Sequence, residues 1–165
     1  MLAVQRDDAA LRLWAGGVAS RTEAEALLRR LMFQENRASW AVIDQRGELA
    51  GGISLHSVDV VQNDASIGYW TAPAARGRGV AAAAVDAACR WAFGALPIDR
   101  IELCHAVENV ASGRVAEKAG FTYEGHLRRS FRRCSATPPL LPIPTVWRTS
   151  RIPARWQARS RRSGA

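Results

Sequence analysis

The residues best suited to chemistry form a short loop that carries two glycines and two arginines. The loop separates a predicted strand from a predicted helix and reads Ala72-Pro73-Ala74-Ala75-Arg76-Gly77-Arg78-Gly79. The first amide groups of a helix have no partners within it, and the helix dipole places partial positive charge there. Gly77 and Gly79 let an anion approach those amides closely, and the two arginines add full charges. The loop is therefore predicted to bind a phosphate group.

Two other interpretations of the loop compete with a general phosphate site. One is an ordinary glycine turn at a helix start. The other is a dinucleotide site, because Gly77-x-Gly79-x-x-Ala82 fits that fingerprint and Glu102 follows twenty residues later, where a ribose-binding acid could lie. However, five residues separate Thr71 from Gly77, whereas the fingerprint turns directly off its strand. Phosphate binding outside a dinucleotide fold is favoured, and a Walker loop is excluded because no Gly-Lys-Ser/Thr occurs.

The elements around the loop predict a single α/β (α+β) domain. Strand, helix and strand in succession imply a parallel crossover, so we expect a three-layer mixed sheet with a central parallel strand pair and helices on both faces. The predicted helices cover 7–15, 20–31, 79–93 and 110–119, and the predicted strands cover 40–43, 49–58, 65–71, 100–106 and 121–128.

Periodic apolar residues define the buried stripes expected for two of these helices. Ser20 to Glu23 form a capping box at the start of the first of them, and Gly94 and Pro97 are expected to end the second. The first stripe comprises Ala24, Leu27, Leu28 and Leu31, and the second comprises Val80, Ala84, Ala87, Ala88 and Trp91.

Charge is divided unevenly along the 165 residues. The net charge is +8, yet residues 128–165 hold ten arginines and no Asp or Glu, so residues 1–127 are close to neutral. A near-neutral domain argues against nucleic-acid binding by the folded part. The basic tail is interpreted as a solvated extension in preference to the alternative, a nucleic-acid or ribosome anchor.

Composition also bears on the compartment. Apolar residues make up 48 % of the chain, which suffices for a core, but no apolar run reaches the roughly 18–20 residues of a membrane-spanning helix. Residues 1–8 lack the pattern of a secretory signal, and Cys89, Cys104 and Cys134 lack metal-ligand spacing. We therefore expect a cytoplasmic protein with reduced thiols, no membrane partner and no metal.

Two motifs together resemble the GCN5-related N-acetyltransferase (GNAT) family over about residues 9–133. The run Arg76-Gly77-Arg78-Gly79-Val80-Ala81 fits the family's Arg/Gln-x-x-Gly-x-Gly/Ala motif for acetyl-CoA. Asn109-Val110-Ala111-Ser112, followed by Gly120-Phe121 and Glu124-Gly125, resembles the subgroup that acetylates the N-terminal amine of ribosomal proteins. The resemblance implies a GNAT-like fold and an N-acetyltransferase that uses acetyl-CoA.

The resemblance also implies roles for individual residues. The amides of Arg76, Gly77, Arg78, Gly79, Val80 and Ala81 would bind the pyrophosphate of coenzyme A. Thr71 would lie near the acetyl group, and Asn109 would hold the pantetheine arm. Ser112 would lie near the sulfur and protonate the leaving thiolate, although a serine near a helix start is also common for structural reasons.

The implied reaction is direct attack of an amine on a thioester, which requires a neutral nitrogen. An α-amino group with a pKa of about 7.7–8.0 meets this requirement more readily than a lysine near 10.4, so no strong base is required. Tyr69 and Trp70 could flank the acyl site, although strand alternation places one of them in the core. The candidate bases are His56, Glu102, His105 and Glu124, and each also fits an ordinary satisfied side chain.

The chain departs from the family pattern at both ends. The first strand of the acetyltransferase-like domain, residues 1–134, is shortened or lost, and the Arg- and Pro-rich tail, 135–165, offers only a remnant strand near 143–149 before a disordered end. Pairing between sheet edges would permit a homodimer. The alternatives to an enzyme acting on a protein N-terminus or a small amine are a weak or inactive CoA-binding module and a ribosome- or RNA-associated protein.

Overall fold

The computed structural model describes residues 20–32, 34–127 and 144–150. The predicted helix over 7–15, the region where a shortened first strand was predicted, and Cys134 lie outside the described residues. All strands and helices predicted between residues 20 and 128 are present. The elements are α3 (Arg21–Met32), β1 (Ala38–Ile43), β2 (Leu49–Asp59), β3 (Asp64–Thr71), the 3-10 turn η1 (Pro73–Ala75), α4 (Val80–Ala95), β4 (Arg100–Ala106), α5 (Val110–Lys118), β5 (Thr122–His126) and β6 (Pro144–Ser150).

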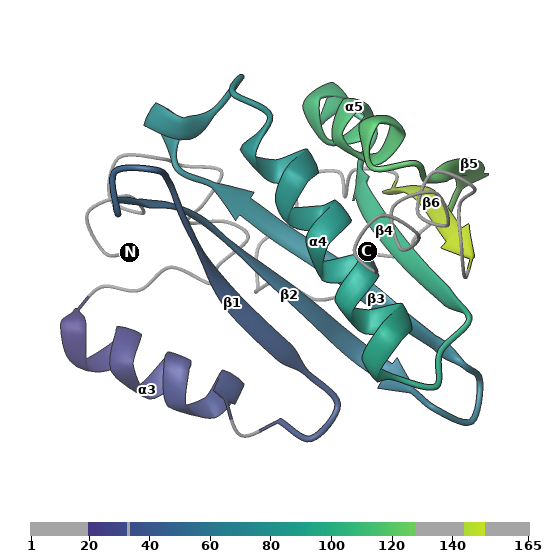
Figure 1. Ribbon diagram of the computed structural model, residues 1–165, viewed down its shortest axis with the longest axis horizontal. Helices are drawn as coiled ribbons and strands as arrows, with labels where there is room; N and C mark the ends of the chain where they lie inside the picture. Colours follow the sequence, from purple (N-terminus) through teal and green to yellow (C-terminus); the bar gives the residue numbers. More distant parts are fainter. Residues whose placement is uncertain (1–19, 33, 128–143, 151–165) are drawn as a thin grey trace, which may run out of the picture.

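The strands form one six-stranded sheet in the order β1-β2-β3-β4-β6-β5 (Figure 1). Strands β1, β2 and β3 pair antiparallel, whereas β3 and β4 pair parallel because α4 carries the chain back between them. Strand β6 lies antiparallel between β4 and β5. The predicted mixed sheet with a central parallel pair is confirmed.

The core lies between the sheet and helices α4 and α5, which cover the same face of the sheet (Figure 1). Alternate residues of β2, β3 and β4 point into it, as strand geometry requires. Helix α3 packs beside β1 (Figure 1). The core residues are Ile53, Leu55, Ala65, Ile67, Ile101 and Leu103 from the sheet and Val85, Ala88, Cys89, Ala92, Ala116 and Ala119 from the helices.

The buried stripe of α4 differs from the predicted one. Trp91 is exposed, whereas Val85 and Cys89 occupy core positions. The run of alanines over 81–84 leaves the apolar period of this helix undefined, so the pattern could not fix which side faces the sheet. Trp91 instead makes an edge-to-face contact with Trp40 of β1, with 4.9 Å between ring centroids.

The start of α3 agrees with the sequence prediction, whereas the end of α4 differs from it. The Ser20 hydroxyl accepts a hydrogen bond of 3.2 Å from the Glu23 amide, which confirms the predicted cap of α3. Leu28 of the expected stripe is exposed, however. Gly94 lies inside α4 and does not end it, because the cap is Leu96, directly before Pro97.

Strand β6 is a complete interior strand where a remnant was expected. Its backbone pairs with seven residues of β4 on one side and with β5 on the other. Proline occurs in the strand only at its first residue, Pro144, where a missing amide hydrogen is tolerated. The strand therefore brings residues of the Arg-rich segment into the sheet, next to the edge strand β5.

Candidate active site

The glycine loop presents an open helix start to solvent. Gly77 and Gly79 have φ angles of 73° and 78°, which favour glycine, and both are exposed. The first helical hydrogen bond of α4 runs from the Ala83 amide to the Gly79 carbonyl at 3.1 Å, and no side chain caps Gly79. The amides of the first turn are therefore left without partners in the helix. This geometry suits a bound anion.

The two loop arginines contact different parts of the chain. The guanidinium of Arg76 donates a hydrogen bond of 3.3 Å to the Thr71 carbonyl, so it folds back toward the end of β3. A guanidinium nitrogen of Arg78 lies 3.8 Å from a carboxylate oxygen of Asp44 in the β1–β2 turn. The pKa of Asp44 is lowered by hydrogen bonds from the amides of Arg46 and Glu48 and, to a smaller extent, by the charge of Arg78.

Strands β3 and β4 pair over only part of their length. Their parallel ladder ends at the pair Ile67 and Leu103, although β3 continues for four residues and β4 for three. The continuing parts remain paired with β2 and β6 instead. The two central strands therefore diverge from Gly68 and Cys104 onward, and backbone groups that face this gap lose their ladder partners.

Ser112, at the start of α5, lies beside the diverging part of β3. Its hydroxyl oxygen accepts a hydrogen bond of 2.8 Å from the Tyr69 hydroxyl, and both side chains are half-buried. Burial raises the pKa of Tyr69. The Asn109 side chain caps α5 by accepting a hydrogen bond of 3.2 Å from the Ser112 amide. The sequence indicated Asn109, Ser112 and Tyr69 separately, but not that they form one connected group.

The candidate base His105 is occupied on both ring nitrogens. Its Nδ1 lies 2.7 Å from the Ala106 carbonyl oxygen, and its Nε2 accepts a hydrogen bond of 3.0 Å from the Trp147 indole. Both ring nitrogens of His105 therefore already have hydrogen-bond partners. The geometry therefore does not favour a base role for His105.

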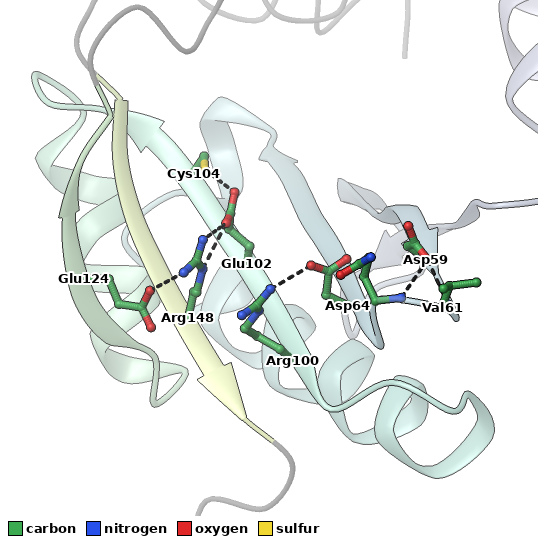
Figure 2. Close-up of polar contacts among 9 residues, drawn as sticks. Asp59, Val61, Asp64, Arg100, Glu102, Cys104, Glu124 and Arg148 are labelled. Atoms are coloured by element: carbon green, nitrogen blue, oxygen red, sulfur yellow. Dashed lines mark hydrogen bonds and ion pairs between the residues drawn. The ribbon is translucent and has the colours of Figure 1, made fainter.

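Glu102 and Glu124 share one arginine (Figure 2). Arg148 donates to Glu102 through Nε at 3.1 Å and Nη2 at 2.9 Å, and to Glu124 through Nη1 at 2.6 Å. The second oxygen of Glu102 accepts a bond of 3.1 Å from the Cys104 thiol. Both carboxylates are therefore already engaged by the guanidinium of Arg148. The sequence did not indicate Arg148 as a partner of these carboxylates, because it lies in a segment with no recognisable motif.

His56 is the remaining candidate base, on the sheet face opposite α4 and α5. It is half-buried, and its pKa is lowered by burial and then by the positive charge of Arg37. Among the residues that the structure describes, no group of three or more His, Cys, Asp or Glu is placed to hold a metal ion. Nor is any helix in those ranges long and apolar enough to cross a membrane.

A parallel pair that diverges beside an open, glycine-rich helix start, within a mixed sheet, is the arrangement expected of the GNAT fold. The chain belongs to the GNAT acetyltransferase family: residues 1–122 match the family described as "Acetyltransferase (GNAT) domain". The crystal structure of a Vibrio cholerae spermidine N-acetyltransferase, in complex with CoA and spermine, superposes with a TM-score of 0.75 at 22 % identity and covers 91 % of this chain and 87 % of that one. At this identity the likeness shows the fold alone.

Named relatives are similar over shorter stretches. A Bacillus subtilis (strain 168) protein named "Putative ribosomal N-acetyltransferase YdaF" is 43 % identical over 82 residues, 50 % of this chain and 45 % of the relative. The spermidine N(1)-acetyltransferase of Vibrio cholerae is 28 % identical over 109 residues, 66 % of this chain and 63 % of the relative. The ribosomal-protein-serine acetyltransferase of Escherichia coli (strain K12) is 28 % identical over 100 residues, 61 % and 56 % of the two chains. The chain thus spans about half to two thirds of the length of these relatives.

Proposed function

We propose that the protein transfers an acetyl group from acetyl-CoA to a primary amine. The observation that carries this proposal is the open start of α4 beside the point where β3 and β4 diverge. One feature suits a pyrophosphate and the other suits a thioester, and coenzyme A joins these two groups by a flexible arm. Membership of the GNAT family supports the same conclusion.

The binding roles proposed for the loop follow from its exposed amides. The backbone amides from Gly77 to Ala81 bind the pyrophosphate, whereas the Arg76 amide, which the sequence also indicated, already donates to the Pro73 carbonyl at 3.2 Å. The guanidinium groups of Arg76 and Arg78 add positive charge. Thr71 lies at the end of β3, where the acyl end of the arm would pass. Because the Asn109 side-chain oxygen is used to cap α5, its amide nitrogen is the group left to bind the pantetheine arm.

The proposed reaction is attack of the amine nitrogen on the thioester carbonyl, so that a C–N bond forms and the C–S bond breaks. A backbone amide in the gap between β3 and β4 stabilises the developing oxyanion, an effect of about 3–4 kcal/mol in comparable acyl-transfer sites. Ser112 protonates the leaving thiolate. Its hydroxyl oxygen accepts a hydrogen bond from the Tyr69 hydroxyl, so the hydrogen of Ser112 itself points elsewhere and can be donated to the thiolate.

The names of the relatives and the pKa values of the candidate amines both bear on which amine is the acceptor. Two of the relatives are named for ribosomal substrates and one for spermidine. A peptide N-terminus, with a pKa of about 7.7–8.0, is more often neutral at pH 7 than an alkyl amine near 10.4. We therefore propose the N-terminal amine of a protein as the acceptor, with a polyamine as the second candidate.

The test combines a binding assay with a turnover assay. Acetyl-CoA is expected to raise the melting temperature, because a ligand that binds only the folded state stabilises it. Thiol release should then require an amine, with an alanyl tripeptide amide and spermidine as acceptors and the N-acetylated peptide as the blank. A melting shift without turnover on either acceptor would favour the inactive CoA-binding module. No shift and no turnover would overturn the proposal.

A further inference from the structure

Polar side chains form a row across the sheet face opposite α4 and α5. The strand registers place His56 of β2, Ser66 of β3, Glu102 of β4 and Arg148 of β6 next to one another in that order. Strand β3 contributes only small residues to this part of the face, Ser66 and then Gly68. The bulky polar groups on either side of β3 are therefore His56 and Glu102, and Glu102 is held by Arg148 (Figure 2).

An open hollow of about 640 Å³ lies at the His56 end of this row. The α3–β1 loop forms one wall, and two hydrogen bonds tie that loop to β2: the Val58 amide donates to the Asn36 carbonyl at 3.2 Å, and Arg37 Nη2 donates to the Ser54 hydroxyl at 3.0 Å. The lining is polar. It consists of Gln34, Glu35, Asn36, Arg37, His56 and Ser57.

His56 lies at the hollow and also close to Gly68, where β3 leaves β4. It lines the hollow, and its Nε2 would lie 3.3 Å from a methyl group placed on Gly68, the first residue of β3 beyond the parallel ladder. The next residue, Ser57, has a φ of +51°, and the β2–β3 register shifts directly after His56. Bulges of this kind re-aim a strand's side chains and are frequent beside active sites.

The surroundings of His56 keep an acceptor lone pair available. Burial and the nearby Arg37 charge lower its pKa, so the ring is neutral at pH 7. Its Nδ1 lies 3.4 Å from the Ser57 hydroxyl oxygen, and a proton on Nδ1 leaves Nε2 free to accept one. The other groups that face His56 are the hydroxyls of Ser54 and Ser66, with Glu35 across the hollow and Glu102 beyond β3.

We infer that the hollow receives the amine acceptor and that His56 Nε2 takes the proton that its ammonium group must lose. The inference rests on the proposed acetyl transfer and extends it. The neutral nitrogen then forms the C–N bond as the C–S bond breaks. Of its two remaining protons, one stays on the amide nitrogen. The other passes through solvent to Ser112, where it replaces the hydrogen that Ser112 gives to the leaving thiolate. His56 returns its proton to solvent. Glu35 attracts the incoming cation.

The experiment compares wild type, His56→Gln, His56→Ala, Glu35→Gln and Glu25→Gln, with the alanyl tripeptide amide as acceptor. His56→Gln should lower kcat by a factor on the order of 10² to 10⁴ while the acetyl-CoA Kd stays unchanged. In wild type, kcat should fall as the pH drops through the depressed pKa of His56, and the variant should lose this limb. Added imidazole should restore part of the activity of His56→Ala, which a purely structural role would not allow.

The glutamate variants test the hollow itself. Glu35→Gln should raise the KM for the peptide several-fold without changing kcat. Glu25→Gln removes a charge from α3 outside the hollow and should leave both constants unchanged. If the wild-type protein is active and His56→Gln has the same kcat and pH profile, the inference is overturned but the proposed acetyl transfer still stands. A wild-type protein that neither binds acetyl-CoA nor acetylates the peptide would overturn both.

Discussion

The Tyr69 hydroxyl donates a hydrogen bond of 2.8 Å to the Ser112 hydroxyl across 43 residues of sequence. The bond joins the diverging part of β3 to the first turn of α5, which are the two elements that border the proposed thioester site. It also fixes which lone pair of Ser112 is occupied. Tyr69 therefore orients a group that is proposed to donate a proton, and its own raised pKa keeps it protonated near neutral pH.

Tyr69→Phe should lower kcat several-fold and leave the acetyl-CoA Kd nearly unchanged, because Ser112 loses its fixed orientation while the binding loop stays intact. The free energy of unfolding should fall by about 0.5–1.5 kcal/mol, the usual contribution of one hydrogen bond. Tyr123→Phe removes a hydroxyl from an exposed tyrosine of β5 and serves as the control. Equal kcat values in the two variants would show that Tyr69 does not position Ser112.

Gly79→Asp should weaken acetyl-CoA binding at least ten-fold, since it places a carboxylate beside the proposed pyrophosphate site. Gly79→Asn is the matched control, because both residues tolerate a φ of 78° and have nearly the same shape. The Asn variant should retain most of the affinity. Calorimetric titration distinguishes the two, and similar affinities for both would mean that the phosphate binds elsewhere.

Cys104 should react slowly with thiol reagents at pH 8. Its pKa is raised to about 12, first by burial, then by its hydrogen bond to Glu102 and by that residue's charge. The thiolate fraction at pH 8 is therefore very small, and it grows only as the pH rises toward 12. Glu102→Gln removes the charge and should speed labelling of Cys104, measured by mass spectrometry in a Cys134→Ser background. An unchanged rate would contradict the assigned cause.

Arg148→Met should lower the free energy of unfolding by about 1–3 kcal/mol, because it leaves the partly buried Glu102 without its charged partner. Loss of the exposed contact to Glu124 adds less than about 1 kcal/mol. A double-mutant cycle with Glu102→Gln isolates the coupling, measured by urea unfolding. Zero coupling would mean that β6 does not pair with β4 in solution.

Local sequence patterns predicted most of the helices and strands. They did not predict the features that depend on how strands pair or on which face of a helix is buried. The capping box at Ser20 and the glycine loop predicted the starts of α3 and α4 from adjacent residues. The prediction of which side of α4 is buried was wrong, because the alanines at 81–84 give no apolar periodicity that distinguishes one side of the helix from another. A remnant strand near 143–149 was predicted from the family pattern. Its full pairing between β4 and β5 was not, because pairing depends on partner strands that the local Arg-rich composition does not specify.

The same distinction holds for the candidate site. The loop residues from Arg76 to Ala81 are contiguous, so a motif could indicate them. His105, His56 and Glu102 were equivalent as candidate bases in the sequence, and only their partners separate them. Trp147 donates a hydrogen bond to His105, and Arg148 donates to Glu102. Both partners lie on β6, more than forty residues further along the chain.

The most direct measurement is a crystal structure of the protein with coenzyme A. We expect the pyrophosphate within hydrogen-bond distance of the amides from Gly77 to Ala81. We expect the sulfur between Gly68 of β3 and Cys104 of β4, within reach of the Ser112 hydroxyl. A coenzyme bound with its pyrophosphate away from the start of α4, or with its sulfur outside the gap between β3 and β4, would contradict this expectation.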